Sequence, residues 1–276
     1  MLKFNYHSHS SFCDGKNTLE EMVISAIEKK LSYFGFSAHS PVPFENDFAL
    51  KEEDIKAYLD ETIRLKEKYK GEIKLFTSME FDYIPGLCEN LRQKAKEYNL
   101  DYIISSVHLV SGNGLWFIDG SKQESFDKGL EECFSGDIKK GVKAFYSQTN
   151  EMITKEKPDI IGHFDKVKMH NKDRYFLEDE AWYEALVLES LNLIKENNII
   201  CDINTRGLYK GRSKDYFPQR RWIKEMAKLR IPITISTDSH NKDEVDKLFA
   251  ECWEDIKQLG HKEVWYFDGT WKTISL

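Results

Sequence analysis

Phe4-Asn5-Tyr6-His7-Ser8-His9 is the stretch around which the chain is organised. A short apolar run that ends in this way predicts a strand near the N-terminus, and residues two apart on a strand share a face. His7 and His9 therefore point to one side, and a strand that presents two imidazoles can offer both to one metal ion. Because such a pair also occurs by chance, a metal site requires further ligands from the rest of the chain.

Length and composition limit the possible classes of protein. The 276 residues are enough for a large core and fit one α/β barrel or two smaller domains. No apolar stretch reaches about 18 residues and no cationic segment precedes an apolar one at the N-terminus, so we expect no membrane span, no signal peptide and a cytoplasmic location. The formal net charge of -7 disfavours nonspecific nucleic-acid binding and favours a small-molecule substrate. The sequence does not indicate an oligomeric state.

The five cysteines are scattered and form no Cys-x-x-Cys motif. An odd number without such spacing indicates reduced thiols rather than a disulfide framework or a zinc ribbon. Cys13 lies between His9 and Asp14, and we do not expect it to be a ligand.

Short apolar runs alternate with longer segments of helical period. The predicted strands cover residues 3–8, 33–38, 73–81, 102–110, 159–164, 199–205 and 233–239. The predicted helices cover residues 18–31, 51–70, 86–99, 123–156, 179–197, 218–229 and 242–259. Thr18 and Glu21 form a capping box, Pro218 suits a first helical turn, and Gly260 suits a helix end. The tail, residues 264–271, predicts a hairpin that turns at Asp268-Gly269.

Strands that alternate with helices predict a parallel sheet with right-handed crossovers, either closed or open. No Gly-x-Gly-x-x-Gly or Walker loop follows any predicted strand, which removes the usual reason for an open nucleotide-binding sheet. We therefore predict an α/β barrel that forms a single domain over residues 1–276.

Histidine or carboxylate residues follow six of the seven predicted strands. The nine candidates are His7, His9, Asp14, His39, Glu80, His108, His163, Asp238 and His240. Barrel enzymes hold their chemistry at this end of the strands, and only His170 and His261 among the eight histidines lie elsewhere. Imidazole and carboxylate without thiolate suit Zn, Mn, Fe or Co, and nine ligands exceed the needs of one ion. The pattern predicts two or three metal ions.

The order and spacing of these elements resemble the polymerase-and-histidinol-phosphatase (PHP) family, and within it the stand-alone histidinol-phosphate phosphatases. The matching elements are His7-Ser8-His9 with Asp14-Gly15, Ser37-Ala38-His39-Ser40-Pro41, Glu80-Phe81-Asp82-Tyr83-Ile84-Pro85-Gly86, Ser105-Ser106-Val107-His108, Gly162-His163-Phe164-Asp165, Asn204-Thr205-Arg206-Gly207-Leu208 and Thr237-Asp238-Ser239-His240. The resemblance implies a distorted seven-stranded (β/α)7 TIM-like barrel with a trinuclear site.

By the same resemblance, three groups of residues hold three ions. The first group is His7, His9, Glu80 and Asp238, the second is Glu80, His108 and His163, and the third is Asp14, His39 and His240. Two departures from the family pattern concern the third site. Ala38 replaces a carboxylate that many relatives have before the strand-two histidine, which would weaken this site, and Asp14 stands where some members use histidine, which leaves the preferred metal open.

The implied activity is metal-dependent hydrolysis of L-histidinol phosphate to L-histidinol and phosphate, in histidine biosynthesis, with Zn, Mn or Fe. Glu80 and Asp238 would hold the ions that activate water, and Arg206 would grip the phosphate with two hydrogen bonds. Lys168 and Arg212 are lesser candidates for phosphate contact, and Asp238 and His240 for the proton donor. The acidic and aromatic segments 44–47 and 116–119 could face the ammonium and imidazole of the substrate.

Three alternatives stay open at this point. One is a PHP phosphoesterase that acts on nucleoside monophosphates or oligonucleotide ends, although the acidic charge disfavours the latter. Another is an amidohydrolase-type barrel, which commonly bridges two metals through a carbamylated lysine that the middle strands here lack. The last is a noncatalytic metal-binding scaffold, which the retention of every ligand position disfavours.

Overall fold

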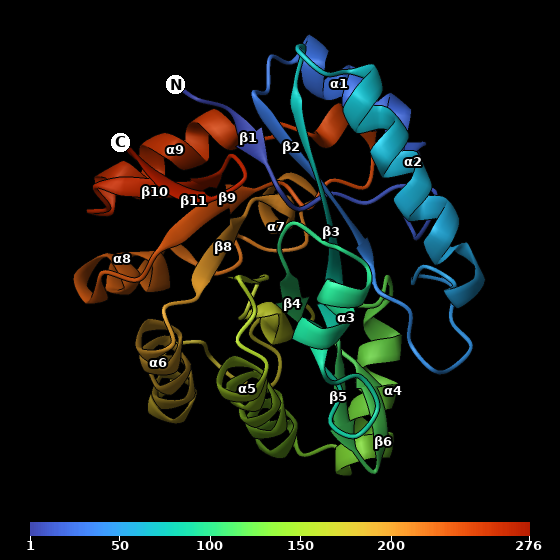
Figure 1. Ribbon diagram of the computed structural model, residues 1–276. Coiled ribbons are helices and arrows are strands. Elements are labelled where there is room, and N and C mark those ends of the chain that lie inside the picture. Colours follow the sequence, from blue (N-terminus) through green and yellow to red (C-terminus); the bar gives the residue numbers. More distant parts are fainter.

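Seven parallel strands form one sheet that is nearly closed into a barrel (Figure 1). The computed structural model describes residues 1–276. In spatial order the strands are β1 (Phe4–Asn5), β2 (Tyr33–His39), β3 (Lys74–Asp82), β4 (Ile104–Ser106), β7 (Ile160–Ile161), β8 (Ile200–Asn204) and β9 (Ile233–Ser236). The backbone N–H of His9 donates to the carbonyl of Ser239 at 2.8 Å, which joins the segments after the first and last strands. The predicted α/β barrel is confirmed.

Helices connect the strands and lie around the outside of the sheet (Figure 1). They are α1 (Leu19–Glu28), α2 (Ile55–Lys68), α3 (Leu91–Glu97), α4 (Gln123–Phe134), α5 (Ile138–Lys155), α6 (Ala181–Glu196), α7 (Arg206–Tyr209), α8 (Arg220–Leu229) and α9 (Phe249–Gln258), with 3-10 turns η1 (Glu52–Asp54), η2 (Lys166–Lys168) and η3 (Lys242–Glu244). The capping box of α1 is present, because Thr18 accepts from the N–H of Glu21 and Glu21 accepts from that of Thr18. Gly260, with φ +105°, follows the end of α9 as predicted. No helix is long and apolar enough to cross a membrane.

The predicted strand 102–110 is wrong in its second half. β4 ends at Ser106, and β5 (Leu109–Gly112) pairs instead with β6 (Gly114–Phe117) in a separate antiparallel hairpin. The change of direction occurs at His108, whose backbone N–H donates to the carboxylate of Asp82 at 2.9 Å. An apolar run gives no sign of this long-range contact.

Two helix predictions also differ from the structure. The predicted helix 123–156 is broken after α4, because Ser135 and Gly136 have φ of +54° and +73°, and Asp137 then caps a new helix. Pro218 lies before α8 rather than in its first turn, since Gln219 is the N-cap. The preceding residue, Phe217, is held by two backbone hydrogen bonds with Asn204.

The tail forms the predicted hairpin, β10 (Glu263–Phe267) with β11 (Trp271–Ser275). It packs against aromatic side chains at the start of the strands: the Tyr6 hydroxyl donates to the carbonyl of Phe267 and accepts from its N–H, both at 2.8 Å. The Phe76 ring lies 4.9 Å from that of Phe267. The hairpin therefore covers the end of the barrel opposite the candidate ligands.

Candidate metal centre

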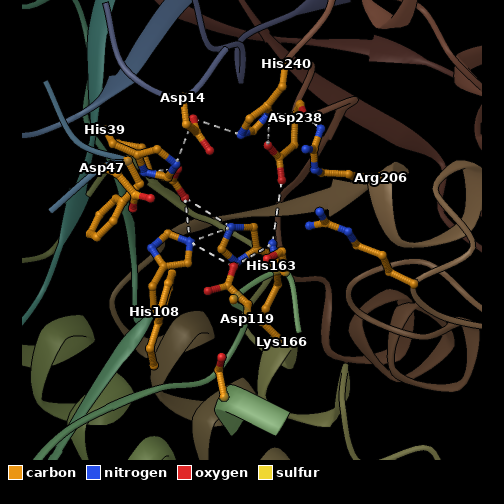
Figure 2. Close-up of a pocket in the computed structure, with 17 residues that line it drawn as sticks. Asp14, His39, Asp47, His108, Asp119, His163, Lys166, Arg206, Asp238 and His240 are labelled. Atoms are coloured by element: carbon orange, nitrogen blue, oxygen red, sulfur yellow. Dashed lines mark hydrogen bonds and ion pairs between the residues drawn. The ribbon is translucent and has the colours of Figure 1, made fainter. Parts of the chain in front are cut away.

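The nine candidate ligands lie together at the carboxyl ends of the strands, and all except His7 and His9 line a pocket of about 340 Å³ (Figure 2). His39 and Glu80 occupy β2 and β3, whereas the other seven are in the loops that follow strands. Since the seven strands of the barrel are parallel, loops far apart in the sequence meet at this one end. The convergence that the sequence predicted is present in the structure.

Glu80 is the centre of this cluster and is 1% exposed. Its Oε2 lies 3.1 Å from Nε2 of His7 and 3.2 Å from Nδ1 of His39. Its Oε1 lies 3.1 Å from Nε2 of His163 and 3.6 Å from Nε2 of His108. Burial alone raises the pKa of Glu80, but the surrounding imidazoles hold it well below its ordinary value. Glu80 is thus an ionised carboxylate whose two oxygens face different histidines.

A second group of ligands surrounds Asp14. Its Oδ1 lies 3.2 Å from Nε2 of His240 and 3.7 Å from Nε2 of His39. His9 stands between the two groups, because its Nδ1 lies 3.9 Å from Asp14 and its Nε2 lies 3.5 Å from Asp238. The predicted third group is therefore extended by His9.

The donor atoms fit metal ions because several of them are buried without a hydrogen-bond partner. These atoms are Nε2 of His7, Nε2 of His9, Nδ1 of His39 and Oε2 of Glu80. Buried polar atoms are normally paired, and leaving one unpaired costs about 1–3 kcal/mol. Here the three nitrogens face one carboxylate oxygen at 3.1 to 3.5 Å. A cation between them would satisfy all four atoms at once.

Two further carboxylates, which the sequence analysis did not identify, orient the histidines. Asp202 in β8 lies 3.1 Å from Nδ1 of His7, and Asp82 at the end of β3 lies 3.0 Å from Nδ1 of His108. Each carboxylate favours the tautomer with a proton on Nδ1 and leaves Nε2 free to face the cluster. His39 has no such partner outside the ligand set, as expected from Ala38. A carboxylate inside a buried strand was the available sequence signal for Asp202.

Comparison with known proteins agrees with this geometry. A model of the PHP domain matches residues 5–206. The chain belongs to the PHP domain family. It is 26% identical to the histidinol-phosphatase of Bacillus subtilis over 89% of this chain and 96% of that one, and 28% identical to a probable histidinol-phosphatase of Schizosaccharomyces pombe over 88% and 82%.

Solved structures share the fold of this PHP domain. The protein HisK of Listeria monocytogenes superposes with a TM-score of 0.81 and 22% identity, over 90% of this chain and 99% of that one. Histidinol phosphate phosphatase of Lactococcus lactis, complexed with zinc, L-histidinol and phosphate, superposes with a TM-score of 0.68 and 22% identity, over 97% of both chains.

Two of the candidate ligands have unusual backbone conformations. His163 has φ +24° and Asp238 has φ +47°. Such values are uncommon for residues other than glycine and cluster at functional sites, where the surrounding structure compensates for the strain. Both residues follow a short strand, so the turn directs their side chains into the pocket.

Three cationic side chains line the pocket: Lys166, Arg206 and Arg212. Nζ of Lys166 lies 3.3 Å from Asp119 and 3.8 Å from Asp238 (Figure 2). Arg206 is partly committed, because its Nη1 donates to the carbonyl of Asp238 at 2.8 Å. Arg212 makes no ion pair and is the least constrained of the three. Lys166 was missed because it does not stand directly after a predicted strand, whereas Asp119 lies in the segment 116–119 that the sequence analysis proposed to face the substrate.

The predicted role of Lys168 in phosphate contact does not fit its position. Lys168 does not line the pocket, and its Nζ lies 2.6 Å from Oδ2 of Asp165 among buried residues. Lys166 and Lys168 are two residues apart on the 3-10 turn η2, so they point in different directions. Of the two lysines on this turn, Lys166 rather than the predicted Lys168 therefore lies on the pocket wall.

Proposed function

We propose that this protein is a metal-dependent phosphomonoesterase that hydrolyses L-histidinol phosphate to L-histidinol and phosphate. One observation carries the proposal: buried and unpaired donor atoms converge on Glu80 beside a pocket that three cationic side chains line. The cluster suits metal ions and the cations suit a phosphate dianion. The curated relatives that bear the name histidinol-phosphatase supply the choice of ester.

The proposed cofactor is two or three ions of Zn, Mn or Fe. The first would be held by His7, His9, Glu80 and Asp238, the second by Glu80, His108 and His163, and the third by Asp14, His39 and His240. When bound, such ions lower the pKa of water from about 15.7 toward about 7 and neutralise phosphoryl oxygens. The zinc in the Lactococcus lactis protein supports this choice.

The protein's own side chains would bind and orient the phosphate. Arg212 has a free guanidinium, and Lys166 is held between Asp119 and Asp238 with its ammonium toward the pocket. Arg206 would add one contact while it fixes the backbone of Asp238. The leaving alkoxide requires a proton, and the two candidate donors, Asp238 and His240, both stand on the pocket wall.

The cellular setting is part of the same proposal. Hydrolysis of L-histidinol phosphate belongs to histidine biosynthesis, and we place the reaction in the cytoplasm with no nucleic-acid or membrane partner. The net charge of -7 supports this choice of a small substrate.

Phosphate release tests the proposal directly. Protein loaded with Zn or Mn is assayed on L-histidinol phosphate, nucleoside monophosphates, phosphoserine and an aryl phosphate. We expect a strong preference for L-histidinol phosphate that Asp238→Asn abolishes. A preference for nucleotides would overturn the proposed substrate but keep the proposed phosphomonoesterase reaction. Metal-loaded protein with no activity on any ester would overturn both the substrate and the reaction.

A further inference from the structure

The pocket carries opposite charges on its two sides. Figure 2 shows Asp47 beside His39 on one side, with Arg206 across the pocket from it. Arg212 and Lys166 add to the cationic part, whereas the rings of Phe48 and Phe117 line the pocket together with Asp47. A ligand that matches this wall is anionic at one end and both cationic and aromatic at the other.

We infer that Asp47, Phe48 and Phe117 form a subsite that selects the ammonium and the aromatic ring of the substrate, away from its phosphate. The inference rests on the proposed function and deepens it, because it names residues that separate L-histidinol phosphate from other phosphate monoesters. None of these three residues belongs to the groups of side chains that could hold a metal ion.

The aromatic part of this subsite is built from two distant segments. Phe48 lies in the loop after β2 and Phe117 ends β6, and their rings stack with centroids 5.6 Å apart and an interplanar angle of 29°. Both pack on a small apolar cluster of Ile84, Cys88 and Leu109, which is separate from the main cores of the barrel. Contacts with this separate cluster therefore hold the two stacked rings in place beside the candidate metal centre.

Both segments are fixed relative to candidate metal ligands. In the first, Oδ1 of Asn46 accepts from the N–H of Phe48 at 3.1 Å, and the carbonyl of His39 accepts from the N–H of Leu50 at 3.0 Å. In the second, the N–H of Ile118 donates to the carbonyl of His108 at 3.0 Å. A preorganised wall of this kind loses little entropy when a ring docks on it.

Asp47 carries the only carboxylate of this subsite, and that carboxylate is unpaired. Its carboxylate makes no hydrogen bond or ion pair, whereas that of Asp119, another acidic residue that lines the pocket, lies 3.3 Å from Nζ of Lys166. Asp47 is exposed, so an ammonium that it binds stays partly hydrated. The contact therefore contributes only a modest binding free energy. Selectivity rather than rate is the expected effect.

Truncated substrates test each half of the subsite. The substrates are L-histidinol phosphate, the analogue without the amine, 3-(imidazol-4-yl)propyl phosphate, and the analogue without the ring, 2-aminopropyl phosphate. Asp47→Asn should raise KM for L-histidinol phosphate about threefold to tenfold with kcat unchanged, and should leave the deamino analogue unaffected. Phe117→Leu should weaken both substrates that carry the ring and spare 2-aminopropyl phosphate.

Matched controls separate recognition from packing and from general charge. Glu53→Gln removes an exposed, unpaired carboxylate near the same loop, and Leu115→Ala shortens a side chain of the same apolar cluster two residues before Phe117 on the same face of β6. Neither control should change the ratio between substrates. The inhibition constant of the product L-histidinol gives a second readout without turnover, and it should rise in Asp47→Asn and Phe117→Leu only.

The outcomes distinguish the subsite from the proposed function. Wild-type preference for L-histidinol phosphate, combined with equal effects of Asp47→Asn on the amine-bearing and deamino substrates, would overturn the subsite alone. Effects of Leu115→Ala equal to those of Phe117→Leu would overturn the aromatic half. Wild-type protein without activity on L-histidinol phosphate would overturn the subsite together with the proposed function.

Discussion

Nδ1 of His7 and Oδ2 of Asp202 lie 3.1 Å apart, and both side chains are at most 1% exposed. The carboxylate stands behind the imidazole, on the side away from Glu80. Because the pair is buried, Asp202 fixes both the tautomer and the orientation of the ring whose Nε2 faces the cluster. A residue that touches no pocket surface thereby determines how a ligand is presented.

Asp202→Ala should weaken metal binding about tenfold to a hundredfold, because His7 loses the acceptor that orients it. Competition with a chromophoric chelator would measure the affinity. Cys201→Ala, at the neighbouring buried position on the other face of β8, is the control and should leave affinity unchanged. Equal affinities in Asp202→Ala and the wild type would contradict the role.

Glu80→Gln should abolish turnover while the barrel remains folded. The neutral amide keeps the volume of the side chain but removes the charge that faces His7, His39, His108 and His163. We expect phosphate release to fall at least about a hundredfold and bound metal to decrease, with an unchanged circular dichroism spectrum. An active Glu80→Gln protein with full metal content would contradict the proposed role of Glu80 in metal binding and turnover.

Chelation should destabilise the protein as well as inactivate it. Removing the ions leaves the buried nitrogens around Glu80 and its Oε2 without partners. An ion present at about a hundred times its Kd adds about 2.7 kcal/mol, so Tm should fall by about 5–10 °C for each ion lost. Calorimetry before and after chelation checks this, with restoration by Zn or Mn as the control. An unchanged Tm would show that these atoms hold no metal.

Lys166→Met and Lys168→Met should have opposite consequences. Lys166 faces the pocket, so its loss should raise KM or lower kcat for the phosphate ester about tenfold or more. Lys168 is paired with buried Asp165, so its loss should cost about 3 kcal/mol of unfolding free energy and spare the kinetics of the folded fraction. Urea unfolding and steady-state kinetics on both variants decide between them, and the reverse pattern would restore the sequence prediction.

Asp246 should make a pH-dependent contribution to stability. Although burial alone raises the pKa of Asp246, hydrogen bonds from Lys3 and Lys29 hold it below its ordinary value. The ionised form is favoured by folding, so the contribution is present above about pH 4 and is lost as the pH falls through the folded-state pKa. In metal-free protein, Asp246→Asn should cost about 1 kcal/mol at pH 7 and progressively less below pH 4. A difference independent of pH would count against the ion pairs.

The ligand set was predictable because each member leaves a local signal. His39, His108 and His163 each end an apolar run, and the parallel arrangement of strands is enough to bring such positions together. The barrel was predictable for the same reason, since alternation of strands and helices is a local pattern. Metal binding itself stays a prediction, as do the roles of Arg206 and Arg212 toward phosphate.

The remaining features depend on contacts that no local pattern reports. The separate β5–β6 hairpin follows from the hydrogen bond between His108 and Asp82, which are far apart in the sequence. Whether Lys166 or Lys168 faces the pocket depends on the rotation of one 3-10 turn. Asp202 resembles any other charged residue inside a strand until its contact with His7 is seen. The contacts of these side chains depend on the direction in which each one points, and spacing along the sequence does not report that direction.

Because the barrel closes between His9 and Ser239, it cannot close until Ser239 has been synthesised. The first ligands leave the ribosome long before Asp238 and His240, so an incomplete nascent chain holds only part of the cluster. Contacts of such large sequence separation form late and slowly. Under the proposed function, tight metal binding would therefore require a chain that has closed its barrel, and metal content would report on chain completion.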